Sequence, residues 1–305
     1  MTTEYLEQVK NYINNAGTLS DNFGRFSKLY NMTTENSYGF LKNYDLRDKK
    51  VLTVAGSGDQ RLNAYFLGAK SVTCFDINPL TKLHINLKDK ALTTVNFEKF
   101  IKFFNVYSRK YGDYYYSLDY RIFDELKELL DNYTYSFYNY LINELVNYID
   151  SDIYFDFLND LNALEKMNIY LNPDNYEVLS KIMRDKEVNF IESNLDCLPE
   201  KLNNEKFDMI LLSNISDYTH KMYEREDLVQ YRIIINKLIN NLNLYGTIQV
   251  GYIYSKYSKL DDVSEFRINS KREKIFPKDT FDTILVDSYQ DSNLKDKVII
   301  YQKIK

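Results

Sequence analysis

The hydrophobic and polar positions of residues 50–92 switch between two periods. The runs "KVLTVAG" (50–56) and "SVTCFD" (71–76) are short and almost wholly apolar, which is typical of strands buried on both faces. The runs "DQRLNAYFLGA" (59–69) and "PLTKLHINLKDKAL" (79–92) repeat apolar residues at helical spacing instead. Strand, helix, strand and helix joined by tight turns predict a parallel βαβ unit, in which Asn78 caps the second helix.

The second half of the chain continues this pattern. It predicts strands at 188–193 and 207–213, a helix at 225–243, a strand after Gly246, and two last strands within 281–303. The fold class that follows is α/β, with a doubly wound, mostly parallel sheet that ends in a hairpin.

Two further segments are helical in period. Residues 4–14 place Tyr5, Val9 and Ile13 on one face, and residues 97–186 repeat apolar positions over a length that a minimal α/β domain does not need. The long segment predicts a helical insertion that is either a lid over the ligand edge of the sheet or an oligomer interface. We therefore expect an N-terminal helical segment (1–48), a Rossmann-like domain (49–96 and 187–305), and the insertion (97–186).

Composition limits the partners. The chain has 305 residues and a formal net charge of -5, with Lys and Arg scattered along it, so no nucleic acid partner is expected. Cys74 and Cys197 lack the spacing of metal ligands, and no metal is expected. The first residues lack a signal-peptide pattern and no long apolar run occurs, so we expect no transmembrane segment and a cytoplasmic location. The oligomeric state is left open.

Candidate chemistry lies where the two predicted strands of the βαβ unit end. Gly56 and Gly58 follow the first strand, and Asp76 ends the second. A glycine turn lets a ligand approach the backbone closely, and a carboxylate at the neighbouring strand tip accepts both hydroxyls of a ribose. The pattern therefore predicts an adenosine-containing ligand.

The identity of that ligand follows from what the loop lacks. The dinucleotide fingerprint needs a third glycine where this chain has Arg61, and no Gly-Lys-Ser/Thr follows Gly58. The looser glycine loop of S-adenosylmethionine binding remains. The alternative is a glycine turn with a strand-capping Asp in an unrelated α/β fold.

The run from Val54 to Phe104 resembles a known family. Its glycine loop, Asp-x-Asn-Pro turn, Leu/Lys/Ala helix and Phe-rich stretch are similar to the betaine-lipid enzymes that transfer a 3-amino-3-carboxypropyl group from S-adenosylmethionine to diacylglycerol. Shorter likenesses lie in "LLSNISDY" (211–218) and "MTTEN" (32–36). The resemblance implies a class I methyltransferase-like fold with bound S-adenosylmethionine. It does not fix which carbon is transferred, or to what.

Roles for individual residues follow from this resemblance and from their places at strand ends. Cofactor-binding candidates are Tyr30, Thr34, Asn36, Gly56, Ser57, Gly58, Asp76, Ile77, Asn194, Leu195, Ser213, Asn214 and Ile215. The catalytic acid/base candidates are Asp217, Tyr218 and His220, with a solvated helix start as the alternative reading.

The sequence is compatible with three functions. The first is a transferase that moves a methyl or a 3-amino-3-carboxypropyl group to a small or lipid-like acceptor. The second is an RNA or protein methyltransferase, and the third is a non-catalytic S-adenosylmethionine-binding protein.

Overall fold

The computed structural model describes residues 1–20, 24–33, 35–104, 120–144, 165–216, 229–253, 281–287 and 296–305. The chain divides into two compact units. The first unit holds Met1–Thr34, Ala55–Leu62 and Asp76–Glu192, and the second holds Glu35–Val54, Asn63–Phe75 and Ser193–Lys305.

The second unit is built on a sheet. Its strands are β1 (Lys50–Val54), β2 (Ser71–Asp76), β4 (Phe207–Leu211), β5 (Leu242–Ile253), β6 (Phe281–Asp287) and β7 (Lys297–Lys303). They follow the order β2-β1-β4-β5-β7-β6. The first four are parallel, whereas β7 runs antiparallel to both β5 and β6. The predicted parallel series with a terminal hairpin is confirmed.

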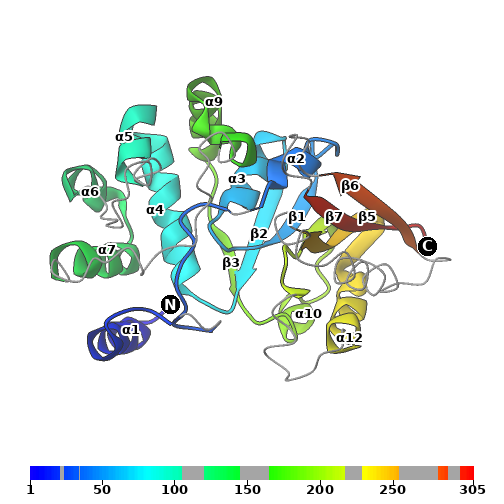
Figure 1. Cartoon of the computed structure of the whole chain (residues 1–305), viewed down its shortest axis with the longest axis horizontal. Helices are drawn as coiled ribbons and strands as arrows, with labels where there is room; N and C mark the ends of the chain where they lie inside the picture. The colour runs from blue at the N-terminus through cyan, green and yellow to red at the C-terminus, as the bar shows by residue number, and fades with distance from the viewer. Residues whose placement is uncertain are drawn as a thin grey trace. The chain divides into compact units, whose positions relative to one another are not determined.

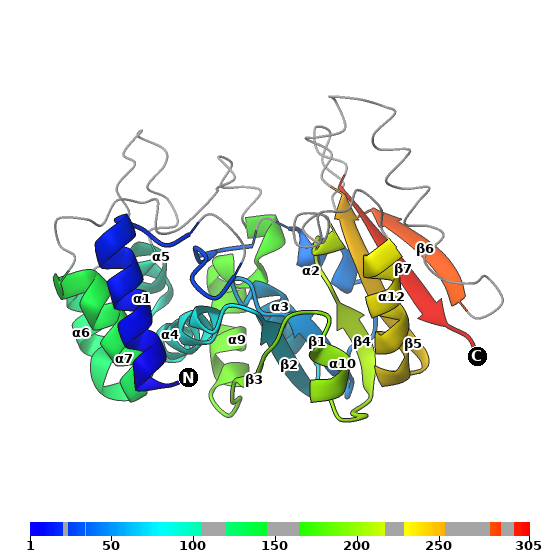
Figure 2. The same ribbon diagram turned by 90° about the horizontal axis from the view of Figure 1, so that it is seen from below.

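Helices lie on both faces of this sheet. Figures 1 and 2 place α10 (Leu198–Lys201) and α12 (Val229–Leu238) on one side and α2 (Ser37–Leu41) on the other. A short 3-10 helix, η6 (Ile239–Asn241), joins α12 to β5. β5 starts directly after this helix at Leu242, four residues before the predicted turn at Gly246. Its register with β4 is irregular near this start. The doubly wound α/β class is confirmed.

The first unit is mostly helical and is organised around α4. Helices α5, α6, α7 and α9 all pack against α4, and α1 packs against α7 (Figure 1). The elements are α1 (Thr3–Ala16), α4 (Leu80–Thr94), α5 (Phe97–Phe103), α6 (Tyr120–Leu126), η2 (Lys127–Leu129), α7 (Asn132–Asn139), η3 (Tyr140–Glu144), η5 (Ile169–Leu171), α9 (Pro173–Met183) and strand β3 (Asn189–Glu192). Helix α3 (Asp59–Phe66) starts in this unit and ends in the other.

Local sequence explains where the helices of the first unit begin. The Thr2 side chain accepts a hydrogen bond from the Tyr5 N–H and caps α1, whose buried face includes Val9 and Ile13 as predicted. Pro79 occupies the N-cap position of α4, one residue later than predicted, and Oδ1 of Asn78 accepts from the Leu80 N–H at 3.0 Å. The described parts of 97–186 contain α5, α6, α7 and α9. A helical insertion over the whole stretch stays a prediction.

Candidate functional site

The glycine loop follows directly after β1. Gly56 and Gly58 have φ values of 47° and 84°, in the left-handed region that glycine adopts without strain. The Gly58 N–H donates to the Ala55 carbonyl at 2.7 Å and closes the turn. A Cβ on Gly58 would lie 3.0 Å from Cγ1 of Ile85, whereas a Cβ on Gly56 would meet no atom within 4 Å. Gly58 is therefore a packing residue, and Gly56 faces open space.

Asp76 lies beside this loop. Its Oδ2 accepts a hydrogen bond from the Gly56 N–H at 3.2 Å, and its Oδ1 accepts from the Asn78 N–H at 3.0 Å. β1 and β2 are neighbours in parallel register, with Val54 opposite Phe75, so the two strands end side by side. The glycine turn and the carboxylate are thus brought together as the sequence predicted.

The electrostatics of Asp76 are those of a poorly hydrated carboxyl group. The side chain is partly exposed, but the surrounding protein raises its pKa to about 6. The backbone N–H groups of Asn78, Gly56 and Ile77 oppose this shift because they stabilise the charged form. Further hydroxyl donors from a ligand would act in the same direction as these N–H groups.

Ser57 contributes to the loop through its backbone. Its side chain is buried and its Oγ donates to Oδ2 of Asp59 at 2.8 Å. The hydroxyl is therefore engaged by the protein itself.

A second polar group lies at the carboxyl end of β4. Oγ of Ser213 donates to Oε1 of the buried Glu35 at 2.5 Å. The side-chain amide of Gln249 accepts from the Ser213 N–H at 2.7 Å and donates to the Ser213 carbonyl at 2.9 Å. Ser213 has a φ of 54°, which is uncommon for a residue other than glycine. Gln249 thus holds a strained strand exit in one conformation.

The other candidates occupy varied positions. Asn36 caps α2 through its Oδ1, and its N–H donates to the Tyr252 hydroxyl at 2.9 Å. Oδ1 of Asn194 accepts from the Cys197 N–H at 2.9 Å, and Leu195 is buried. Four further candidates are partly exposed: Tyr30, Ile77, Asn214 and Ile215. Thr34, Asp217, Tyr218 and His220 lie outside the described residues.

Several residues of these groups escaped the sequence reasoning. Asp59 and Lys88 form a buried ion pair, and Tyr170 donates to Asp59. Gln249 is central to the second group. The only available signal was the position of Asp59 directly after Gly58, because the partners come from distant segments.

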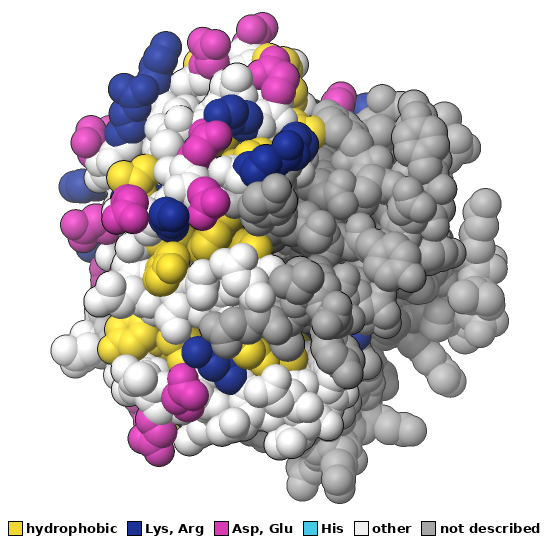
Figure 3. All heavy atoms as spheres, turned by 90° about the vertical axis from the view of Figure 1, so that its left-hand side faces the viewer, with side chains coloured by type: hydrophobic (Ala, Val, Ile, Leu, Met, Phe, Trp, Pro, Cys, Tyr) yellow, Lys and Arg dark blue, Asp and Glu magenta, His cyan; other side chains and the backbone are white. Residues whose placement is uncertain are grey.

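The described surface adds two observations. On the face shown in Figure 3, Lys and Arg side chains are interspersed with Asp and Glu and do not gather in a single patch. Within the described ranges, none of the helices has the length and apolar character needed to cross a membrane.

The loop and Asp76 fit the adenosine part of S-adenosylmethionine. Such a ligand needs close access to the backbone, which the open space at Gly56 provides. It also needs an acceptor for the ribose hydroxyls, and the carboxylate of Asp76 lies next to that opening. The strand order and the terminal hairpin are those of the class I methyltransferase-like Rossmann fold.

No protein family matches this sequence, and no curated protein does. Among solved structures, the chain is similar to an rRNA methylase from Streptococcus thermophilus, with 11% identity, 88% of this chain and 95% of that chain covered, and a TM-score of 0.37. It is also similar to the N-methyltransferase NodS from Bradyrhizobium japonicum WM9 in complex with S-adenosyl-L-homocysteine, with 9% identity, 88% and 84% covered, and a TM-score of 0.40.

Proposed function

We propose that the protein is an S-adenosylmethionine-dependent transferase that moves a methyl or a 3-amino-3-carboxypropyl group to a small or lipid-like acceptor. One observation carries the proposal: the Asp76 carboxylate ends β2 beside the glycine turn that ends β1, within hydrogen-bond distance of the Gly56 N–H. A partly exposed carboxylate next to open backbone suits a ribose over a glycine loop.

The residues have distinct roles in this proposal. The backbone of Gly56, Ser57 and Gly58 lies against the cofactor, Asp76 accepts the ribose hydroxyls, and Ile77 offers an apolar side chain to the adenine. The remaining cofactor contacts are assigned to Tyr30, Thr34, Asn36, Asn194, Leu195, Ser213, Asn214 and Ile215.

Little further chemistry is required of the protein. The bound cofactor supplies a carbon on a sulfonium leaving group, which is already activated. The chain must align the acceptor in line with that carbon and exclude water. Asp217 or Tyr218 is proposed as the base that takes the proton of the acceptor, and His220 is the third acid/base candidate. Replacing the base should lower kcat while the affinity for the cofactor stays nearly the same.

The carbon that is transferred distinguishes two activities, methyl transfer and 3-amino-3-carboxypropyl transfer. Methyl transfer leaves S-adenosylhomocysteine, whereas aminocarboxypropyl transfer leaves methylthioadenosine. Incubation of the protein with S-adenosylmethionine and candidate acceptors, followed by mass spectrometry of the by-product, distinguishes the two.

Binding of the cofactor is tested by calorimetry with S-adenosylhomocysteine. The variant Asp76→Ala loses the ribose acceptor, so we expect its Kd to rise at least about tenfold, a loss of about 1.4 kcal/mol. Asp208→Ala is the matched control, because Asp208 in β4 also accepts a backbone N–H, that of Lys50 at 2.9 Å. Its Kd should equal that of the wild type. Equal affinity of the Asp76→Ala protein and the wild type would remove the ribose assignment.

A further inference from the structure

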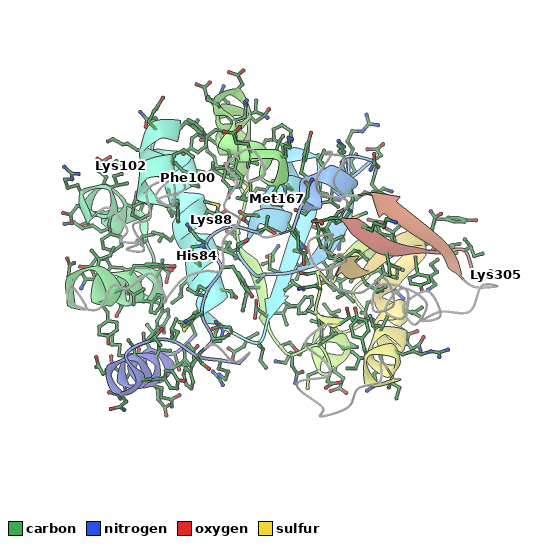
Figure 4. All side chains as sticks on the ribbon, in the orientation of Figure 1. His84, Lys88, Phe100, Lys102, Met167 and Lys305 are labelled. Carbon is green, nitrogen blue, oxygen red and sulfur yellow. The ribbon has the colours of Figure 1, made fainter. Side chains whose placement is uncertain are left out.

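Asp59 and Lys88 bury opposite charges directly beneath the glycine loop. Oδ1 of Asp59 lies 2.8 Å from Nζ of Lys88, and the two side chains are 0% and 1% exposed. Asp59 is the first residue of α3, and Lys88 lies one helical turn beyond His84 on α4 (Figure 4). The pair therefore joins the start of the loop helix to the central helix of the first unit.

All three N–H donors of the Lys88 ammonium group have acceptors in this region. An ammonium group has three N–H donors, and Nζ contacts the Ser57 carbonyl at 2.7 Å and the Asn31 carbonyl at 2.5 Å in addition to Asp59. Burial lowers the pKa of Lys88 below its usual value, and the carboxylate of Asp59 offsets part of this shift. One of the three contacts is thus to the backbone of the glycine loop itself.

Both carboxylate oxygens of Asp59 also accept hydrogen bonds. Its Oδ2 accepts from the Thr33 N–H at 2.5 Å and from Oγ of Ser57 at 2.8 Å, and its Oδ1 accepts from the Tyr170 hydroxyl at 2.6 Å. Burial and the charge of Asp59 raise the pKa of Tyr170, which keeps this hydroxyl protonated as a donor. The carboxylate connects the loop to the N-terminal segment and to η5.

A second buried ion pair joins the same two helices. Nη1 of Arg61 in α3 lies 2.8 Å from Oδ1 of Asp89 in α4, and Nη2 donates to the Glu187 carbonyl. None of these bonds reaches the loop residues 55–58. Both pairs are buried and join α3 to α4, but only Lys88 donates to the Ser57 carbonyl of the loop.

We propose that Asp59, Lys88 and Tyr170 are positioning residues that fix the backbone of the glycine loop in the conformation that binds the cofactor. The inference rests on the proposed function. A buried ion pair gives little net stability, because desolvation of the two charges offsets their attraction. The pair instead fixes the geometry of Ser57, because Lys88 donates to the Ser57 carbonyl and Asp59 accepts from the Ser57 hydroxyl.

The substitution that changes the structure least removes one hydroxyl group. Tyr170→Phe deletes the bond to Asp59, and Tyr176→Phe is its control, since the Tyr176 hydroxyl donates to the Val95 carbonyl at 2.8 Å, away from the loop. We expect the Kd for S-adenosylhomocysteine to rise about three- to tenfold in Tyr170→Phe, which corresponds to the net contribution of one ordinary hydrogen bond. It should change less than twofold in Tyr176→Phe, although both variants lose a similar amount in Tm.

The stronger test compares the two ion pairs. Lys88→Met is expected to raise the Kd at least about tenfold, whereas Arg61→Met lowers Tm and leaves the Kd within about twofold of the wild type. Equal changes in Kd for both members of a comparison, or no change in Kd at all, would overturn the positioning role. Should Lys88→Met fail to fold, the tyrosine comparison still decides. A wild-type protein that does not bind S-adenosylhomocysteine would instead refute the proposed function.

Discussion

The N–H of Gly56 donates to Oδ2 of Asp76 at 3.2 Å, which joins the tips of two neighbouring parallel strands. The two residues stand 20 positions apart in the chain. This bond fixes the Asp76 carboxylate as an acceptor beside the open backbone. The protonation state of this carboxyl group determines whether it can accept from two ligand hydroxyls.

Cofactor affinity should therefore depend on pH. Because burial raises the pKa of Asp76 to about 6, the carboxylate dominates above this pH and the neutral acid dominates below it. Only the carboxylate accepts from both ribose hydroxyls, so affinity falls as the pH drops through about 6 and is about tenfold weaker at pH 5 than at pH 7. Calorimetric titration with S-adenosylhomocysteine between pH 5 and 7 measures this.

The control for the pH series is Asp76→Asn. This variant keeps the shape of the side chain and cannot titrate, so its Kd should vary less than that of the wild type over the same range. Parallel pH profiles for the two proteins would show that another group carries the dependence.

A methyl group on Gly56 should separate binding from stability. Gly56→Ala places a Cβ in the open space beside Asp76, at a φ of 47° that disfavours alanine by about 1 kcal/mol. We expect this loss in the free energy of unfolding and at least about a tenfold rise in the Kd for S-adenosylhomocysteine.

Gly17→Ala is the matched control for this change. Gly17 ends α1 with a φ of 77°, and a Cβ there also meets no atom within 4 Å. The two variants should be similarly destabilised in urea unfolding, and only Gly56→Ala should bind less tightly. Normal binding by Gly56→Ala would contradict the placement of the ligand over this glycine.

Gln249 should matter for stability out of proportion to its size. In Gln249→Leu, the N–H and the carbonyl of Ser213 both lose their partner, so we expect a loss of about 1–3 kcal/mol in the free energy of unfolding. Gln302→Leu is the comparison, because Gln302 makes an exposed bond to the Tyr245 carbonyl. Its effect should stay within about 0.5 kcal/mol, and urea titration of both variants measures the difference.

The alternation of apolar runs and glycines determined the βαβ unit, the later strands, and the pairing of Gly56 with Asp76. This was possible because strand period, turn chemistry and the shared edge of parallel strands depend on neighbouring residues. The placement of Asp217, Tyr218 and His220 stays a prediction. The helix over residues 79–92 was also predicted. The contact of its Lys88 with the glycine loop was not.

Only the tertiary structure decided which charged residues are buried and what they hold. Lys88 lies 29 positions from Asp59, and Ser213 lies 178 positions from Glu35. Such contacts leave no period in the sequence, and a charged residue is normally solvated. Its burial becomes favourable only when packing brings a full set of partners to it, and that depends on the whole chain.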